Sequence, residues 1–344
     1  MENLLLIFAV LIVVTTLYDI FVTVLSHNGA GPITSSWTAA LWKVALFAKY
    51  ELGNKFLIRR VGPLMIIGVL IVWYILIYIS WFIFFYLGNY SIKGAADDSG
   101  LKALDIIYYI GSTFSTLGIG DIVPNGFPWT LISTSGALLV TLLVSFAISY
   151  FIPIVGAVAD RRKLVARLNN IGKSAQEVLD LCWTGPASRQ LDPIVVSIAD
   201  GLVKESYKSQ VYPVLEYFYF KETGASVNLN ILSLYDALIF QDIHKQREDN
   251  AAWSVRLYIL RSIDSYIQNF SRNESYKKRG FSYSHDDFVR FLNSYDEKEK
   301  VLRIKDIDKH IVEKRQCLLN FAHHEGRLKP VDNQLSQKLL PEKD

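Results

Sequence analysis

The sequence has few cysteines and no motif that carries enzyme chemistry. Its two cysteines, Cys182 and Cys317, form no C-x-x-C pair, which disfavours a disulfide scaffold or a zinc site and fits a reducing compartment. It has no nucleophile elbow, no phosphate-binding loop, no metal motif and no G-x-G-x-x-G after a strand. We therefore expect no catalytic residues, no cofactor and no enzymatic activity.

Strong charge of either sign is also missing. Residues 1–159 carry seven basic and seven acidic residues, and residues 160–344 carry 29 basic and 26 acidic ones. Neither part has the basic surface that nucleic-acid binding requires, so no nucleic-acid partner is expected. No segment repeats arginine at three-residue spacing, which excludes a voltage sensor.

Lysine and arginine are absent from three long apolar runs, residues 4–25, 63–87 and 129–158. Each run exceeds the about 20 residues that an α-helix needs to cross the hydrocarbon core of a membrane. The first run could be a signal peptide, but it has no basic start and no A-x-A site, so we expect it to be retained. The sequence therefore predicts a multi-pass membrane protein with three spans.

The stretch at residues 112–124, between the second and third runs, combines four hydroxyl residues with Gly118, Gly120 and Asp121. Glycine reaches backbone conformations that other residues avoid, so alternating it with other residues lets consecutive carbonyl groups point toward one axis. A ring of carbonyl oxygens can replace the water shell of a cation, and the Thr116 hydroxyl would add another ring. Gly-x-Gly alone is also typical of a tight turn, but residues 101–115 have the length of a re-entrant helix and favour an ion pathway.

The stretch from Thr116 to Asp121, T-L-G-I-G-D, resembles the potassium-channel signature T-V-G-Y-G-D. Tyr108 and Tyr109 occupy the positions of the paired aromatic residues that brace the filter in that family, and Pro124 matches a proline that often follows it. The resemblance covers about residues 62–158 and implies a pore domain with an outer helix, a pore helix, a selectivity filter and an inner helix. It implies that potassium ions bind the backbone carbonyls and the threonine hydroxyl of the filter residues Thr116, Leu117, Gly118, Ile119 and Gly120.

Two positions depart from the pattern of that family. Ile119 replaces the usual tyrosine and removes a hydroxyl that ties the filter to its surroundings. Ser112 stands where some members carry a glutamate that contacts the aspartate after the filter. The resemblance assigns support of the filter to Tyr108, Tyr109, Ser112 and Asp121. A cation channel that also admits sodium is therefore the alternative to strict potassium selectivity.

The chain contains one such signature and no internal repeat of it. Four copies close the ring in the family, so the resemblance implies a homotetramer. In the third run, Gly136 is a candidate hinge or a small residue for close helix packing, and Pro153 should bend the helix near its inner end. Both are gating candidates. Ser145 and Ser149 either satisfy the carbonyls that the proline frees or line the pore.

Basic residues flank the three spans unevenly. Five of them lie between the first and second spans and three directly follow the third span: Lys43, Lys49, Lys55, Arg59, Arg60, Arg161, Arg162 and Lys163. Positive charge collects on the cytoplasmic side of a membrane. We therefore expect the first loop and residues 160–344 to be cytoplasmic, with the N-terminus and the filter outside.

The first span and the loop after it leave several interpretations open. Asp19, near the end of the first span, is an interfacial carboxylate, a member of a functional ion pair, or a polar contact to another helix. Residues 26–36 are rich in glycine, proline and serine and predict a loop. Residues 37–56 carry an apolar stripe with lysines on other faces, which is typical of a helix in the membrane interface or of one packed on protein.

From residue 160 onward the sequence is polar with helical periodicity. Apolar residues recur at three- and four-residue spacing in residues 161–183, 193–221, 228–242, 250–271 and 304–322, which predicts an all-α domain. Loops are predicted at residues 223–226 and 273–284, and a disordered tail after Gly326.

Two polar clusters in this part have both a functional and an unremarkable interpretation. His323, His324 and Glu325 could bind a metal ion, but they have no spaced partner, which favours exposed polar residues. The basic cluster is either solvated or contacts anionic lipid, and consists of Arg272, Lys277, Lys278 and Arg279.

Together these features predict an all-α membrane protein of four parts. They are an N-terminal transmembrane helix (1–25), a cytoplasmic loop with an interfacial amphipathic helix (26–61), a potassium-channel-like pore domain (62–159) and a helical cytoplasmic regulatory domain (160–344). The favoured function is a tetrameric potassium-selective channel without voltage gating, with potassium ions, the lipid membrane and further copies of the chain as partners. A membrane-tethered signalling or scaffold protein with a vestigial pore is an alternative, and an enzyme with a membrane anchor is the least favoured.

Overall fold

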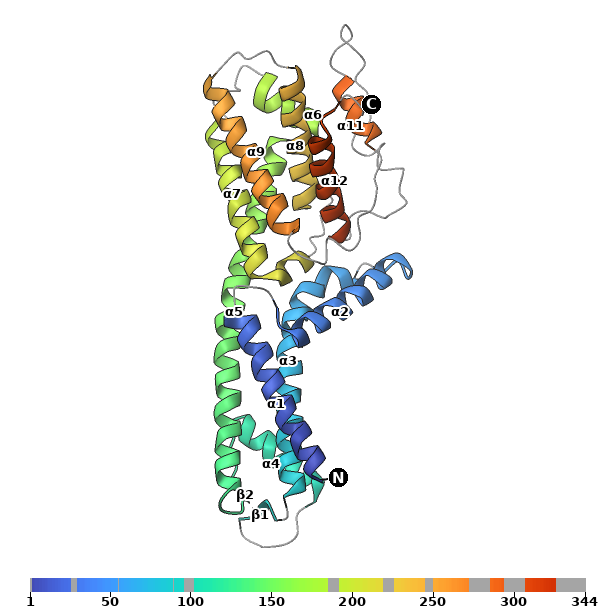
Figure 1. Cartoon of the computed structure of the whole chain (residues 1–344). Helices are drawn as coiled ribbons and strands as arrows, with labels where there is room; N and C mark the ends of the chain where they lie inside the picture. The colour runs from blue at the N-terminus through green and yellow to red at the C-terminus, as the bar shows by residue number, and fades with distance from the viewer. Residues whose placement is uncertain are drawn as a thin grey trace. The chain divides into compact units, whose positions relative to one another are not determined.

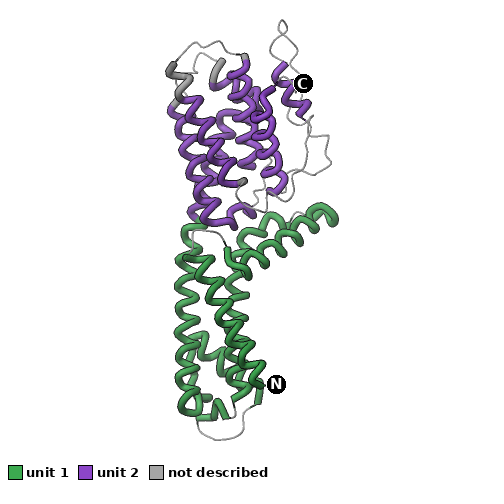
Figure 2. Tube along the Cα trace, in the orientation of Figure 1, with its two compact units in different colours: residues 1–155 green, residues 156–344 purple. Residues whose placement is uncertain are grey.

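A computed structural model describes residues 2–25, 30–54, 56–88, 90–95, 102–184, 192–218, 226–244, 250–271, 285–293 and 307–325. The described elements are helices apart from one small two-stranded sheet (Figure 1). The chain divides into two compact units, Met1–Val155 and Gly156–Asp344 (Figure 2). The boundary falls inside the longest helix, α5 (Trp129–Ile171).

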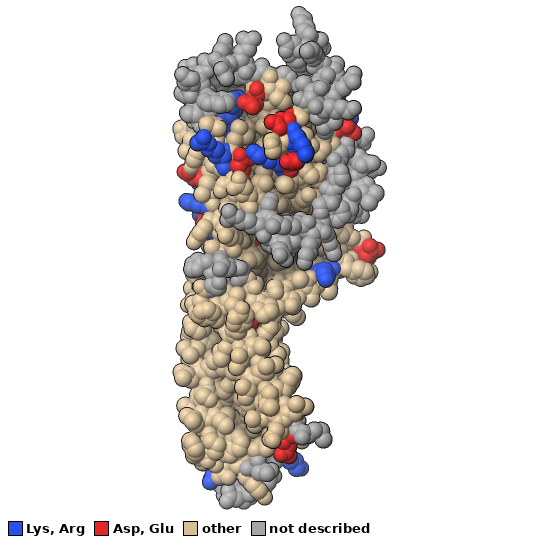
Figure 3. Space-filling view, viewed as in Figure 1, with Lys and Arg blue, Asp and Glu red and all other residues tan. Residues whose placement is uncertain are grey.

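Three helices of unit 1 or extending from it are long and apolar enough to cross a membrane: α1 (Glu2–Leu25), α3 (Phe56–Leu87) and α5. On the face shown in Figure 3, the middle of unit 1 is almost bare of charged side chains. Each helix contains one of the three apolar runs. α3 begins seven residues before the second run, at Phe56, because Arg59 and Arg60 continue the same helix.

The core of unit 1 lies between α3, α5 and the short helix α4 (Ala103–Phe114). The Phe114 ring at the end of α4 meets the rings of Tyr78 and Trp81 edge-on, with ring centroids 6.0 Å apart in both cases. Edge-to-face contacts of this kind restrain aromatic rings in both position and orientation. The end of α4, and therefore the start of the chain after it, is held against α3.

The carboxylate of Asp19 on α1 is fully buried, so its interpretation as an interfacial carboxylate is wrong. It accepts hydrogen bonds from the backbone amide of Ile33 at 2.7 Å, the hydroxyl of Thr34 at 2.6 Å and the indole of Trp73 at 2.8 Å. The polar contact to other helices is the correct alternative. Asp19 also explains why α2 (Pro32–Tyr50) begins inside the predicted loop: a carboxylate at a helix N-terminus satisfies amides that lack a partner within the helix.

One face of α2 packs on α3. Thr34, Thr38 and Ala45 are buried, and the Trp37 indole lies directly over Gly68 of α3. The opposite face exposes Val44 and Phe47. The two interpretations of this helix therefore describe its two faces: one is packed on protein, and the other presents apolar side chains outward.

The small sheet was not predicted. Strand β1 (Ile92–Gly94) pairs antiparallel with β2 (Ile122–Pro124), with Lys93 opposite Val123. Each strand has three residues, too few for an alternating pattern to be recognised in the sequence. The pair fastens the chain that follows the filter residues to the segment after α3. Residues 96–101, between β1 and α4, lie outside the described residues.

Unit 2 is helical, as predicted, but two predicted helices end earlier than expected, and the one expected over 304–322 begins only at Lys309. The first is the end of α5, which stops at Ile171 before Gly172 and is followed by α6 (Ala175–Leu179) and a π-helical turn, η1 (Asp180–Thr184). The second, α7 (Asp192–Val211), ends where Pro213 starts a 3-10 helix, η3 (Pro213–Tyr217). Proline has no backbone amide hydrogen and its ring is incompatible with the preceding turn of an α-helix.

The remaining helices of unit 2 are α8 (Val227–His244), α9 (Asn250–Ser271), α11 (Asp286–Asn293) and α12 (Lys309–His324). α11 was not predicted, and it has only eight residues. The predicted loop at 273–284, the basic cluster between Arg272 and Arg279, and the tail after Gly326 lie outside the described residues.

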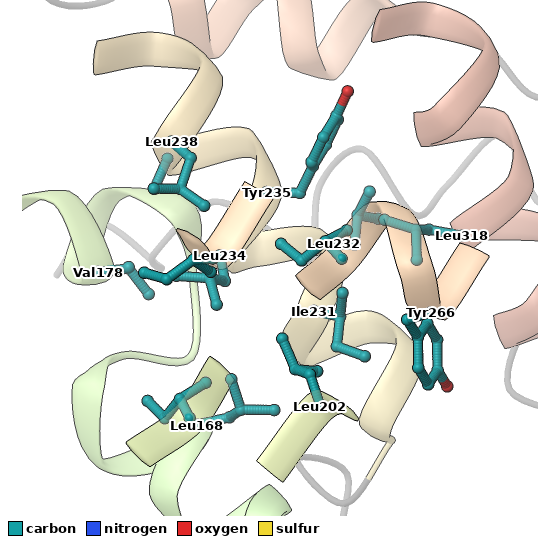
Figure 4. Packing of buried hydrophobic residues seen from close by; sticks show 14 of the residues in the cluster. Leu168, Val178, Leu202, Ile231, Leu232, Leu234, Tyr235, Leu238, Tyr266 and Leu318 are labelled. Carbon is teal, nitrogen blue, oxygen red and sulfur yellow. The ribbon is translucent and has the colours of Figure 1, made fainter. Parts of the chain in front are cut away.

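The core of unit 2 surrounds α8, which is buried on nearly every side. Figure 4 shows Ile231, Leu234 and Leu238 of α8 among side chains from the other helices. These neighbours are Leu168 of α5, Val178 of α6, Leu202 of α7, Tyr266 of α9 and Leu318 of α12. A helix that is buried on all sides, with apolar residues around its whole circumference, is expected at the centre of a helical domain.

Candidate ion-binding site

The candidate site follows the C-terminal end of α4. The helix is closed at its start by the Asp105 carboxylate, which accepts from the amide of Lys102 at 2.7 Å, and the Ser115 amide donates to Gly111 at its end. The predicted re-entrant helix, residues 101–115, agrees with these bounds within two residues. Residues 115–121 then form no regular helix or strand and are exposed within one chain.

Along this stretch, the sign of the backbone φ angle alternates from one residue to the next. Thr116, Gly118 and Gly120 have φ angles of +60°, +55° and +85°, whereas the φ angles of Leu117 and Ile119 between them are negative. A left-handed φ causes no steric strain in glycine, but it is unusual for a β-branched residue such as threonine. Strained backbone of this kind persists at sites where the surrounding structure and a function require it.

Three consecutive amides of the stretch converge on one residue of α4. The amides of Leu117 and Gly118 donate to the carbonyl of Ser112 at 3.1 Å, and the amide of Ile119 donates to the Ser112 hydroxyl at 3.3 Å. In a trans peptide unit the carbonyl points opposite to the amide. The carbonyls of Thr116, Leu117 and Gly118 therefore all point away from α4, toward the exposed side.

This row of oxygens has the chemistry of a cation ligand set. Carbonyl oxygens, which carry no net charge, bind alkali cations that have lost their water shell. The Thr116 hydroxyl supplies a fourth oxygen next to these three carbonyls. The Thr116 hydroxyl donates to the carbonyl of Ser115 at 2.6 Å, which leaves its lone pairs available. The partial negative charge at the end of α4 favours a cation in the same region. Ile119 and Gly120 continue the same exposed stretch.

One chain by itself leaves this row open. The Leu117 and Ile119 side chains are 67% and 54% exposed, so water reaches the stretch freely. A cation loses its water shell only when oxygens surround it, and a row on one side cannot surround an ion. Oxygen ligands from outside this row would therefore be needed to surround an ion.

Two of the predicted supporting residues contact the stretch. Besides Ser112, the Tyr108 hydroxyl donates to the Asp121 carboxylate at 3.0 Å. Asp121 also accepts from the amide of Ile122 at 3.0 Å through its carboxylate, and from the amide of Ala95 at 2.9 Å through its carbonyl. Both ends of the stretch are therefore tied to neighbouring elements.

Tyr109 has a different environment from the one that the resemblance implies. Its hydroxyl is hydrogen-bonded to the Ser133 hydroxyl of α5, and its ring lies edge-on to Phe85 of α3, with centroids 5.3 Å apart. Tyr109 therefore joins α4 to the two long helices of unit 1, and its support of the filter is indirect.

The two gating candidates differ in environment. Gly136 is buried under the Trp81 indole, where a Cβ atom would come within 2.3 Å of the ring. This close approach favours the packing interpretation over a hinge. Pro153 is exposed and lies inside α5, two residues before the boundary between the two units.

A stripe of hydroxyl side chains on α5 was missed as a set in the sequence. Thr134, Thr141, Ser145 and Ser149 are exposed, and their spacing of seven, four and four residues places them on one face. Each hydroxyl donates to the carbonyl one turn earlier, at 2.7, 2.9, 3.0 and 3.1 Å. Ser145 and Ser149 therefore bind carbonyls before the one that Pro153 frees. The repeated spacing was the signal that could have revealed the stripe.

The polar cluster at the end of α12 does not form a metal site. Within the described part of the chain, no group of three or more His, Cys, Asp or Glu side chains could hold a metal ion. Glu325 is not an exposed residue either, because its side chain is 12% exposed and binds Arg161 and Ser226. The expectation of exposed polar residues is wrong for Glu325.

Comparison with known proteins gives one informative similarity. The chain is 25% identical to the uncharacterized membrane protein YdjJ of Bacillus subtilis (strain 168) over 219 residues, which are 64% of this chain and 64% of that protein. The match thus spans less than two thirds of the length of the relative. No family model and no solved structure matches the chain. The three apolar helices and this relative fit an all-α membrane protein.

Proposed function

We propose that the chain forms a homotetrameric, potassium-selective channel that is not gated by voltage. The observation that carries the proposal is the convergence of three consecutive amides on Ser112, which turns the carbonyls of Thr116, Leu117 and Gly118 to one exposed side. Potassium is the permeant ion, and four copies of the row surround it. The chain crosses the membrane three times, with its N-terminus outside and unit 2 in the cytoplasm.

The hydroxyl stripe of α5 supports the same proposal independently. Polar side chains on a membrane-spanning helix face the protein interior or water rather than lipid. Thr134, Thr141 and Ser145 are exposed in one chain and line up on one face of α5. In the tetramer this face borders the water-filled path below the filter, and the remaining exposed apolar face of α5 meets lipid or a neighbouring copy.

Selectivity rests on how firmly the carbonyls are held. Tyr108 braces Asp121 at one end of the filter, and Ser112 holds the amides at the other. These contacts stand in for the tyrosine hydroxyl and the glutamate that the potassium-channel pattern carries at positions 119 and 112. We therefore favour potassium selectivity over the alternative of a channel that also admits sodium.

The test is a flux assay on the full-length protein in liposomes, under a potassium gradient and then a sodium gradient. We expect potassium flux and a reversal potential close to that of potassium. Gly118→Ala should reduce this flux about tenfold or more, because a left-handed alanine costs about 1–2 kcal/mol and the filter backbone must shift. Gly53→Ala is the matched control, since Gly53 has a φ of +64° and open space around it, far along the chain from the filter.

Each outcome decides between the candidate functions. Equal flux of both cations with sensitivity to Gly118→Ala would establish the weakly selective channel. Absence of flux from folded protein would overturn the channel. A scaffold role would then be favoured if cells tolerate Gly118→Ala but not the loss of unit 2.

A further inference from the structure

A buried cluster of charges in unit 2 joins three distant parts of the chain. Arg161, near the C-terminal end of α5, is 2% exposed, and its guanidinium contacts two carboxylates. Its Nε lies 3.2 Å from Glu205 of α7, and its Nη2 lies 2.8 Å from Glu325 at the end of α12. Its Nη1 donates to the carbonyl of Leu215 in η3. The guanidinium thus donates hydrogen bonds to Leu215 and Glu325, whereas its contact with Glu205 through Nε is an ion pair without hydrogen-bond geometry.

Each carboxylate has one further partner. The Ser226 hydroxyl donates to Glu325 at 2.5 Å, and the Ser209 hydroxyl donates to Glu205 at 3.2 Å. Ser226 immediately precedes α8, and its hydroxyl oxygen accepts a hydrogen bond from the amide of Leu229 at 3.1 Å. Glu325 therefore fastens the C-terminal end of α12 both to α5 and to the start of the central helix α8.

The cluster places two carboxylates beside one guanidinium in a site that is almost closed to water, with only the Glu325 side chain partly exposed, at 12%. Lys208, whose charge also acts on Glu205, lies 2.5 Å from Asp160 and is thus engaged with an acid of its own. A buried excess charge is costly, and the least costly way to remove it is to bind a proton. Burial raises the pKa of Glu205 above its ordinary value, and Glu325 adds to the rise, whereas Arg161, Ser209 and Lys208 oppose it.

We propose that Arg161, Glu205 and Glu325 form a proton-sensitive clasp, in which proton binding at Glu205 strengthens the hold of Arg161 on the end of α12. With Glu205 ionised, the guanidinium is shared between two acids that repel each other. With Glu205 neutral, its attraction is directed to Glu325 alone, and the repulsion disappears. Acid closes the clasp, and a rise in pH loosens it.

The sign follows from linkage. A carboxyl group whose pKa is higher in the folded chain than in the unfolded one takes up a proton on folding. Its contribution to stability is therefore fully present below the ordinary carboxyl pKa and is lost as the pH rises through the raised value. The window lies above about pH 4.3, the ordinary value for glutamate.

Other titratable groups surround the clasp and must be separated from it. Tyr266 of α9 stays protonated, because burial raises its pKa well above the usual range, and its hydroxyl donates to Asn228. Glu216 of η3 and the Lys208–Asp160 pair contribute charge nearby. His323 and His324 directly precede Glu325 on α12 and are further titratable groups beside the clasp.

The test is hydrogen exchange of the amides at the end of α12 in the full-length protein, expressed as protection relative to an unstructured peptide at the same pH. Between about pH 5 and about pH 8 we expect protection to fall, by up to about tenfold for each unit by which the pKa of Glu205 is raised. Glu205→Gln, which mimics the protonated acid, should stay protected throughout. Glu325→Gln should be poorly protected throughout, because the clasp is open.

Glu313→Gln is the matched control, since Glu313 lies on the same helix in an exposed pair with Lys309. It should keep the pH dependence of the parent protein. The proposal is overturned if the pH dependence survives in Glu205→Gln, which would assign it to the histidines, or if the parent protein shows none.

A second readout rests on the proposed function. If the protein conducts, flux through α5-lined pores should depend on pH in the parent protein and lose this dependence in Glu205→Gln. Absence of flux in every variant overturns the channel, while the exchange experiment still judges the clasp. Flux that is present but independent of pH overturns the coupling of the clasp to conduction.

Discussion

A single serine organises the filter stretch at the residue scale. Two oxygens of Ser112 accept hydrogen bonds from three backbone amides, and only one of these oxygens belongs to the side chain. Removing the hydroxyl therefore frees the amide of Ile119 but leaves the amides of Leu117 and Gly118 on the backbone carbonyl. The loss affects the middle of the filter and spares the turn that leads into it.

We predict that Ser112→Ala keeps conduction but lowers the preference for potassium over sodium. One neutral hydrogen bond contributes about 1 kcal/mol, which corresponds to about a fivefold change in an equilibrium. The permeability ratio from reversal potentials should therefore fall about fivefold, and Ser112→Thr should retain most of it. Ser36→Ala removes a comparable exposed hydroxyl, bonded at 2.7 Å within α2, and should change nothing. An unaltered ratio in Ser112→Ala would contradict the role of the serine.

The type of residue alone predicted the backbone conformation where that conformation depends only on the residue itself. Gly118 and Gly120 were expected to alternate the backbone hand, and their φ angles do so. Residue type did not predict the burial of charged residues whose partners are distant along the chain. Asp19 bonds Trp73, 54 residues away, and Glu325 bonds Arg161, 164 residues away. Whether a carboxylate is exposed or buried depends on such partners, which no local pattern contains.

At the scale of elements, Asp19 makes α1 an integral part of unit 1. Its carboxylate binds the start of α2 and the side of α3 at once, in a region where water is scarce. An ionised or polar group inside a membrane protein is tolerated when it is fully hydrogen-bonded, as this one is. The first helix is therefore held by a polar anchor rather than by apolar packing alone.

We predict that Asp19→Ala destabilises unit 1 more than any neutral change on the outer face of α1. It leaves the buried Trp73 indole and the amides at the start of α2 without their acceptor, at about 1–3 kcal/mol for each group. The midpoint of thermal unfolding in detergent should fall by about 4 °C or more. Asp19→Asn, which keeps an acceptor oxygen, should lose less.

Thr15→Ala is the control, because the Thr15 hydroxyl is exposed and bonds only carbonyls of its own helix at 2.8 and 3.0 Å. If it lowers the midpoint as much as Asp19→Ala does, the polar anchor is not what holds α1.

Helices were predictable where a long segment of the sequence is apolar throughout. The three apolar runs predicted α1, α3 and α5, because length and apolarity do not depend on the rest of the fold. Short elements were missed: β1 and β2 have three residues each and α11 has eight. Apolar periodicity continues across Pro213 and predicts one helix over 193–221, but the proline ends the α-helix and starts η3.

At the scale of the whole molecule, the candidate site is incomplete in one chain. The oxygens of the filter face outward, and the neighbouring hydroxyl stripe is exposed along α5. Both features demand a polar partner or a water-filled path inside the membrane. The proposed ring of identical copies would supply both, since each copy would contribute the same row of oxygens to one axis.

We therefore predict that the protein purifies as a tetramer with a mass of about four times the 39.1 kDa of one chain, and that potassium stabilises it. An ion that binds the assembled ring and not the separate chains shifts the equilibrium toward the ring, by about 2.7 kcal/mol at a concentration one hundred times its dissociation constant. Native mass spectrometry should show the tetramer, and its dissociation temperature should fall when sodium replaces potassium. Gly118→Ala should abolish the difference between the two cations, whereas Gly53→Ala should preserve it. A monomeric mass, or a tetramer indifferent to the cation, would show that the row of carbonyls is not completed into an ion site by copies of this chain.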